Sequence, residues 1–240
     1  MPELLANDQI QWLLNNAPFA IWETFYTTVI ATFFAYLIGL PLGVLLVAGE
    51  RDGILPLPAS LMAALNVIVN ILRSIPFLIL MVMVIPLSRL ILGTSIGTIA
   101  VIIPLIVAAF PFVARLVEAS LREVDKGVVE AAQSMGCSPL QIIVKVMLPE
   151  SRPSLIAGFT TAFITILSYG AMSGAIGGGG LGNAALNRGY QRRQTLILYG
   201  AVVLLVILVQ IFQSIGTRLA LLLDKRVSSR KVRRRLHPRS

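Results

Sequence analysis

Long apolar runs separated by short polar segments dominate this chain. Five runs, at residues 20–48, 57–87, 95–113, 155–174 and 195–223, each reach or exceed the roughly 18 to 20 residues that a helix needs to cross a bilayer. The pattern predicts an all-α polytopic membrane protein with about five transmembrane helices. No run repeats another, so internal symmetry of the kind found in many secondary transporters is not expected.

The second run is too long for one straight helix that crosses the membrane perpendicularly, at about 1.5 Å of rise per residue. It contains Arg73 followed by Pro76, and a proline inside a helix removes a hydrogen bond and clashes with the preceding turn. We expect a kink or break there, in the cytoplasmic half of the crossing. Arg73 either holds a gate or interface or extends to the inner head groups, and Glu118 is a possible partner.

A polar segment of more than twenty residues, VVEAAQSMGCSPLQIIVKVMLPE at 128–150, stands between the third and fourth runs. Its first part contains good helix formers, and Gly136 can adopt the left-handed conformation that ends a helix. Ser138 and Pro139 then suit the N-cap and first position of a second helix. The spacing predicts a short helix, a turn and another helix. A modest apolar face is expected at Val128, Val129, Ala132 and Met135.

Composition and charge support a membrane protein and set its orientation. Hydrophobic residues make up 56% of the chain and charged residues 13%, whereas charged residues approach a quarter of a soluble protein. With the C-terminus inside, fifteen Lys and Arg residues fall in inner segments and four in outer ones. The positive-inside bias therefore predicts an outer N-terminus and a cytoplasmic polar segment and C-terminus. The same distribution argues against a nucleic-acid partner for the net charge of +9.

These features divide the chain into three parts. Residues 1–19 form an outer interfacial segment, with Trp12 and Trp22 at head-group depth. Residues 20–223 form the transmembrane domain, whose cytoplasmic loop covers about 121–152. Residues 224–240 form a basic cytoplasmic tail, which can attract anionic membrane lipids or simply anchor the topology. The N-terminus lacks the features of a signal peptide, so insertion is expected to depend on the crossings themselves.

Residue types that carry catalysis are scarce. The single cysteine, Cys137, excludes an intrachain disulfide and a cysteine metal cluster. No GxxxxGK[ST] phosphate loop, serine nucleophile elbow or His/Cys cluster occurs. A GxGxxG match at Gly177, Gly179 and Gly182 lacks the preceding strand of a dinucleotide site, so a tight turn or a hinge is expected. We therefore expect no catalytic residues, no metal and no cofactor, and an energy source in a partner.

A candidate solute path follows the fourth run. Thr161, Thr165, Ser168 and Met172 share one helical face, and Tyr169 extends this stripe. Polar groups inside a membrane tend to face protein or a water-filled cavity, so we expect this face to line the path. The competing interpretation is that the hydroxyls bond to their own helix or join helices together. Five helices hardly enclose a path alone, which favours a homodimer with the path on its two-fold axis.

The polar segment resembles a known motif. The sequence Glu-Ala-Ala, three residues, Gly, nine residues, Val-Met-Leu-Pro is similar to the coupling motif of permease subunits of bacterial ABC importers, with Val146 where isoleucine is usual. The matching positions are Glu130, Ala131, Ala132, Gly136, Leu148 and Pro149. The blocks NILRSIPF, GTSIG, AAFPFVARLVEASL and GAMSGAIGGGGLG resemble methionine importer permeases, over most of residues 22–223.

This resemblance implies a type I ABC importer permease fold in a bacterial plasma (inner) membrane. It further implies a homodimer, two copies of an ATP-hydrolysing subunit that receive the coupling helices, and an external solute-binding protein. The outer loop with Gly178, Gly179, Gly180 and Gly182 is expected near the docking surface of that protein. Methionine is the expected solute; another amino acid or a sulfur compound is the alternative. An ion-gradient-driven transporter and a membrane anchor or scaffold are rivals that need no ATPase.

Overall fold

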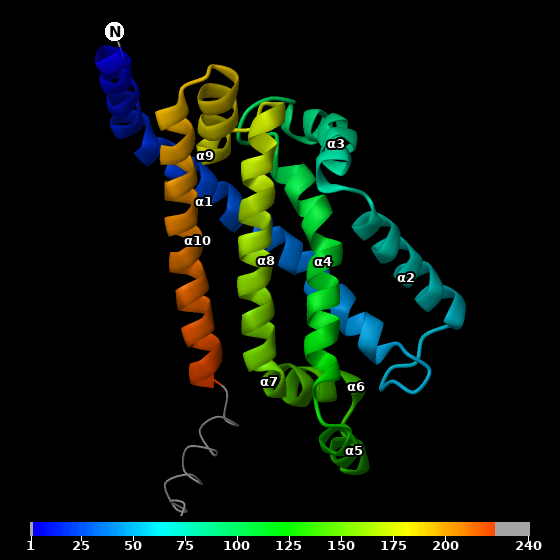
Figure 1. The fold of residues 1–240 in the computed structure, drawn as a ribbon. Coiled ribbons are helices and arrows are strands. Elements are labelled where there is room, and N and C mark those ends of the chain that lie inside the picture. Colours follow the sequence, from blue (N-terminus) through cyan, green and yellow to red (C-terminus); the bar gives the residue numbers. More distant parts are fainter. Residues whose placement is uncertain (1, 224–240) are drawn as a thin grey trace, which may run out of the picture.

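The computed structural model describes residues 2–223, and within this range the chain contains helices and turns but no strand. Four helices are long and apolar enough to cross a membrane: α1 (Pro2–Ala48), α4 (Ile102–Arg122), α8 (Arg152–Ser173) and α10 (Thr195–Leu223). Figure 1 shows α4, α8 and α10 side by side, with α1 running obliquely behind them. The predicted all-α architecture is confirmed. The predicted basic tail at 224–240 lies outside the described residues.

Helix α1 is longer than the first predicted crossing. It ends at Ala48 as expected, but it begins at Pro2 and continues without interruption through the expected boundary between residues 19 and 20. Its 47 residues span about 70 Å, far more than the roughly 30 Å of a hydrocarbon core. Trp12 lies under the guanidinium of Arg188, 4.6 Å from the ring centroid. The N-terminal part of the helix therefore contacts its own chain through Trp12. The interfacial position of residues 1–19 stays a prediction.

The second crossing consists of two helices, α2 (Ala59–Ser74) and α3 (Phe77–Leu92), at an angle of 108°. The break expected at Pro76 is confirmed, because Ile75 is extended and α3 starts directly after the proline. Its expected location is wrong. The junction lies toward the end of the bundle that carries α9, away from α5–α7 (Figure 1). The reason is length, since the 16 residues of α2 rise about 24 Å from the turn that precedes it.

The third crossing is shifted along the sequence relative to the prediction of 95–113. Residues 93–101 form turns, with positive φ at Gly93 and Gly97, and helix α4 then continues to Arg122. The apolar pattern placed the end of the crossing before Arg115. In the structure the helix continues past Arg115 to Arg122, and Glu118 pairs with both arginines. The fourth and fifth crossings agree closely with α8 and α10, and α10 has the predicted bounds.

Short helices connect these long ones at both ends of the bundle. On one side stand α5 (Lys126–Ser134), α6 (Pro139–Ile142), the π-helical η1 (Ile143–Met147) and α7 (Leu148–Glu150). We call residues 126–150 the elbow. On the other side stand η2 (Gly174–Ile176), α9 (Gly180–Asn183) and the π-helical η3 (Ala184–Gln191). We call residues 174–182 the glycine loop.

The core forms where α1 crosses α4. Small residues of α1 allow the two backbones to approach closely: a Cβ added at Gly39 would lie 2.7 Å from Cγ1 of Val113, and one at Gly43 would lie 2.6 Å from the carbonyl oxygen of Ala114. Between them the interior is filled by residues such as Leu105 and Ile166, which are fully buried. Close packing of small residues is the usual way for helices to associate in lipid, where apolar burial provides little driving force.

Candidate functional site

The elbow forms the helix–turn–helix that the sequence predicts. The Asp125 side chain caps α5 by accepting a hydrogen bond from the amide of Gly127 at 2.7 Å. Gly136 ends that helix with φ at +76°, and a Cβ there would meet nothing within 4 Å. Ser138 and Gln141 form a reciprocal capping box at the start of α6, and Pro139 takes its first position. Local side chains and one left-handed glycine therefore define the turn.

The elbow projects beyond the ends of α4 and α8 and exposes its matching motif residues. Glu130, Ala131 and Gly136 are exposed, whereas Leu148 and Pro149 are half-buried. Ala132 is buried at 2% and anchors α5 to the rest of the chain. Of the four residues expected on an apolar face of α5, Ala132 is buried, Val129 is half-buried, and Val128 and Met135 are exposed. Leu140, at the start of α6, is also exposed.

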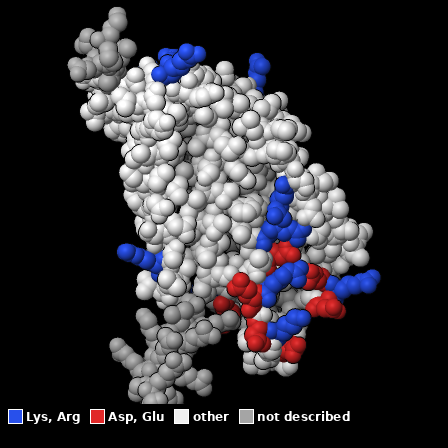
Figure 2. Space-filling model, in the orientation of Figure 1, with Lys and Arg blue, Asp and Glu red and all other residues white. Residues whose placement is uncertain are grey.

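Charged groups concentrate at the base of the elbow. In Figure 2 the acidic side chains in view all lie at this end of the molecule. The Glu118 carboxylate accepts from Arg115 at 2.6 Å and from Arg122 at 2.9 Å, and Arg122 also donates to Glu50 at 2.6 Å. The side chain of Glu118 is only 11% exposed. This network joins α4 to Glu50 in the turn after α1. Its member Arg122 lies three residues before Asp125, the cap of α5.

Arg115 extends the network to α2. Its Nη2 atom donates to the side-chain carbonyls of Asn66 and Asn70, each at 2.9 Å. The suggestion that Glu118 pairs with Arg73 is therefore wrong, because both carboxylate oxygens of Glu118 are engaged on α4. Sequence reasoning missed this network, although the three- and four-residue spacing of Arg115, Glu118 and Arg122 was a usable signal.

The α2–α3 break brings two predicted path residues together. Arg73, in the last turn of α2, and Tyr169, on α8, line one cavity of about 170 Å³ with Phe77, Leu80 and Phe112. The rings of Phe77 and Tyr169 stack with centroids 4.1 Å apart and planes 6° apart. Pro76 contributes indirectly, since the change of direction there separates α3 from α2 and leaves this space. Thr161, Thr165 and Ser168 do not line this cavity.

The polar stripe on α8 satisfies its hydroxyls within the helix. Thr161, Thr165 and Ser168 each donate to the carbonyl oxygen four residues earlier, at 3.0, 2.8 and 3.0 Å. The hydrogen bonds of the competing interpretation, from each hydroxyl to its own helix, are thus present in the structure. They do not cover the stripe, because Thr161, Ser168 and Met172 are still exposed. A hydroxyl oxygen that donates to its own helix can still accept a hydrogen bond from water or solute.

The glycine loop is tightly packed and not a hinge. Gly178, Gly180 and Gly182 are buried, and Gly179 is half-buried. A Cβ at Gly182 would overlap the backbone of Ala171, and one at Gly179 would overlap the Thr98 hydroxyl. Three of the four glycines predicted for a docking loop are thus buried and form little of the molecular surface.

Glu23 of α1 ties the glycine loop to its neighbours, and sequence reasoning missed it. Its carboxylate accepts from the amide of Gly180 at 2.9 Å and from the Thr98 hydroxyl at 2.6 Å. Next to it, the amide of Leu181 donates to the hydroxyl of Thr24 at 2.9 Å. A carboxylate near the start of an apolar run was the available signal, since such a group needs a partner in lipid.

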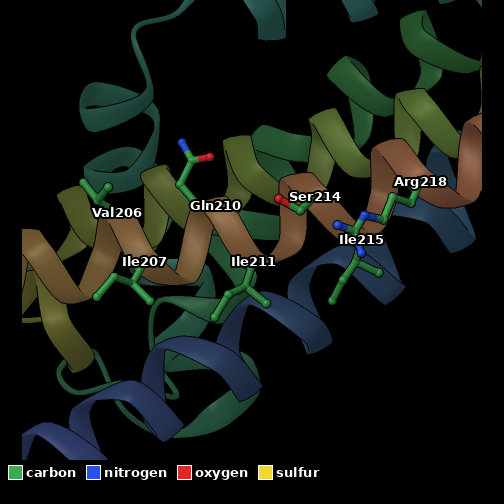
Figure 3. A pocket seen from close by; sticks show the side chains of 7 residues that line it. All are labelled: Val206, Ile207, Gln210, Ile211, Ser214, Ile215 and Arg218. Atoms are coloured by element: carbon green, nitrogen blue, oxygen red, sulfur yellow. The ribbon is translucent and has the colours of Figure 1, made fainter.

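Helix α10 carries a second exposed polar stripe, which the sequence analysis did not single out. Gln210, Ser214 and Arg218 follow one another at intervals of four residues and line a shallow hollow of about 460 Å³. All the lining side chains come from this helix, and Gln210 and Ile211 point in opposite directions (Figure 3). Among the residues whose side chains the structure describes, no group of His, Cys, Asp and Glu converges to hold a metal ion.

Comparison with protein families relates this chain to transporters. Residues 39–229 match the family model described as binding-protein-dependent transport system inner membrane component. The probable D-methionine transport system permease protein MetI of Vibrio cholerae is 49% identical over 224 residues, covering 92% of this chain and 99% of that protein. The D-methionine transport system permease protein MetI of Escherichia coli K12 is 46% identical over 168 residues, covering 70% and 76% respectively.

Solved structures agree with these sequence relatives. An inward-facing structure of the MetNI methionine ABC transporter superposes with a TM-score of 0.85 at 44% identity, covering 90% of this chain and 98% of that one. A crystal structure of an amino acid ABC transporter with histidines superposes with a TM-score of 0.67 at 17% identity. The second likeness concerns the fold alone. The first identifies the arrangement of α1 to α10 as that of a type I importer permease.

Proposed function

This chain belongs to the family of binding-protein-dependent transport system inner membrane components, and we propose that two copies of it form the translocation path of a methionine importer. It is the membrane-spanning permease subunit of an ABC importer, and ATP hydrolysis belongs to a separate ATP-binding subunit. The chain itself is not an enzyme. The observation that carries the function is the exposed elbow, which presents the Glu130 to Pro149 motif outside the helix bundle.

The elbow is the proposed joint with the ATP-binding subunit. Its exposed Met135, Leu140 and Val144 supply apolar contacts, and Glu130 of the same segment is exposed as well. Buried Ala132 and the capped turn make the elbow stiff, so a push on its tip moves it as one body. Through the Glu118 network that body is joined to α2 and to the end of α1. Two ATP-binding subunits, one for each elbow of the dimer, complete the assembly.

The α8 stripe supports a homodimer. Thr161, Ser168 and Met172 are exposed in the single chain, and polar groups that face hydrocarbon are costly. Placing this face on a two-fold axis puts it opposite its own copy around a polar path. The hollow on α10 is not needed for this arrangement.

The orientation follows from the elbow and from charge. The elbow lies on the cytoplasmic side, with the N-terminus outside and the C-terminus cytoplasmic, as the excess of Lys and Arg in the inner segments supports. The glycine loop then faces outward, near the place where an external solute-binding protein docks. Its buried glycines hold that surface in one shape.

Co-purification and uptake test this function. The tagged chain is expressed with its ATP-binding subunit and external binding protein, extracted in mild detergent and reconstituted in proteoliposomes. We expect a stoichiometric ATP-binding subunit on the permease and ATP-dependent uptake of labelled methionine. Uptake driven by an ion gradient without a nucleotide-binding partner would contradict the proposal. Competition with other amino acids and small sulfur compounds defines the solute.

A further inference from the structure

Arg73 is a charged residue that the function described so far leaves without a defined task. It sits in the last turn of α2 beside the break, exposed in the single chain, and lines the cavity of about 170 Å³. The other lining side chains named above are apolar or aromatic. Since a guanidinium in an apolar membrane segment requires water, an anion or a carboxylate, its surroundings need an explanation.

Within the described residues, Arg73 forms no ion pair. Glu118 is paired with Arg115 and Arg122, and Glu50 is paired with Arg122, all at the base of the elbow. Glu23 accepts hydrogen bonds from the Thr98 hydroxyl and from the amide of Gly180 in the glycine loop. These three carboxylates are thus engaged elsewhere, and the guanidinium of Arg73 remains available to a ligand.

Besides the charge of Arg73, the cavity has an aromatic wall formed by Phe77 and Tyr169. Phe77 and Tyr169 present stacked rings at one wall, 4.1 Å apart, and Phe112 adds a third ring nearby. Aromatic rings favour contact with apolar chains, and thioether sulfur in particular interacts well with ring edges. Tyr169 also extends the α8 stripe, and it is the residue of that stripe that lines the cavity together with Arg73.

We propose that this cavity is a transit site for an amino acid, in which Arg73 binds the α-carboxylate and the Phe77–Tyr169 pair contacts an unbranched apolar side chain. The inference rests on the proposed function and adds the chemical class of solute that the path selects. A planar guanidinium matches a carboxylate with two parallel hydrogen bonds, which an ammonium does not reproduce. The same guanidinium could instead bind a lipid phosphate, so the experiment separates the two anions.

The first arm measures methionine uptake by the complete transporter in proteoliposomes. Arg73→Gln is compared with Arg73→Lys and with the matched control Arg89→Gln, which removes an equal charge from the exposed end of α3. We expect uptake to fall about tenfold or more in Arg73→Gln and by less in Arg73→Lys, and to stay within about twofold in Arg89→Gln. Equal amounts of bound ATP-binding subunit establish that assembly is intact. Equal uptake by Arg73→Gln and Arg89→Gln overturns the inference.

The second arm detects the ligand directly. The permease with its ATP-binding subunit, in nanodiscs of zwitterionic lipid and without the external protein, is studied by saturation-transfer difference NMR with methionine and with methionine amide. We expect a methionine signal that is lost in Arg73→Gln, and a much weaker signal for the amide, which lacks the carboxylate. Equal signals from both compounds, or a methionine signal unchanged by Arg73→Gln, contradict a carboxylate site.

The third arm tests the lipid alternative and keeps the two proposals apart. The uptake defect of Arg73→Gln is measured again with increasing anionic lipid. A defect that follows lipid composition, with unchanged methionine binding, assigns Arg73 to a lipid phosphate and overturns the transit site. If the wild-type complex fails to transport methionine at all, the proposed function fails first. If it transports normally and only the Arg73 effects are missing, the transit site alone is wrong.

Discussion

Gly136 in the elbow and Gly182 in the glycine loop stand at opposite ends of the bundle and obey different constraints. Gly136 adopts φ at +76° in open space, so its backbone conformation is what excludes other residues. Gly182 is buried and lies so close to Ala171 that no Cβ fits. At one end of the molecule glycine allows an exposed turn, and at the other it allows two segments to pack closely. The two glycines therefore make different demands on a substituent, one through backbone conformation and the other through lack of space.

The largest effect on stability is expected from adding a side chain within the packed glycine loop. Gly182→Ala places a methyl group on the backbone of Ala171, so the two segments must separate. We expect a loss of about 3 kcal/mol in the free energy of unfolding, measured by SDS titration of the purified chain. Gly170→Ala is the matched control on α8, because nothing lies within 4 Å of its Cβ. Similar stabilities of the two variants would contradict the inference that Gly182 is required for close packing at this end of the molecule.

The next effect concerns the charges at the base of the elbow. Glu118→Gln leaves Arg115 and Arg122 without their shared carboxylate. Arg122 is 48% exposed and keeps Glu50, so we expect a loss of about 2 kcal/mol, less than for a fully buried pair. The loss is measured by SDS titration, and it should shrink in the double variant with Arg115→Gln. Additive losses would show that the two residues do not interact.

A smaller stability effect with a larger functional one is expected at Gly136. Gly136→Val forces a β-branched residue into the left-handed region, which costs about 1–2 kcal/mol but meets no neighbour. We expect normal insertion, together with ATP hydrolysis that no longer drives uptake. Gly136→Asn is the matched control, because asparagine tolerates this conformation. Coupled transport by Gly136→Val would count against a stiff elbow.

The smallest change in stability is expected on the α8 stripe. Thr165→Val and Ser168→Ala remove hydroxyls whose hydrogen bonds return to their own helix. The free energy of unfolding should change by less than about 0.5 kcal/mol. Methionine uptake should fall if the stripe lines the path, and Thr160→Val, a buried threonine of the same helix, serves as the comparison. Unchanged uptake in both stripe variants would remove the stripe from the path.

Much of the architecture could be predicted from local patterns. The length of each apolar run sufficed for α8, for α10 and for the end of α1, but not for its start. The turn chemistry of Gly136, Ser138 and Pro139 predicted the elbow. One boundary was misplaced where charged groups pair with each other. Helix α4 continues past Arg115, and Glu118 pairs with Arg115 and Arg122 within that helix.

The candidate sites divide in the same way. The exposure of Glu130 and Gly136 follows from their place in a polar segment. The contact of the Glu23 carboxylate with the glycine loop could not be predicted in this way, because its two partners are far away in sequence. Nor does the meeting of Arg73 and Tyr169, which depends on the direction that α3 takes after the break.

By itself, the sequence determined the helical class, the number of apolar runs and the position of the turn in the elbow, because hydrophobic run length and the conformations of glycine and proline act within a few residues. Only the tertiary structure decided which polar side chains meet. The contacts of Glu23 with the glycine loop and of Arg115 with α2, and the position of Arg73 beside Tyr169, depend on how the helices pack and on the 108° bend between α2 and α3. Contacts between remote segments arise from packing, which no local pattern encodes.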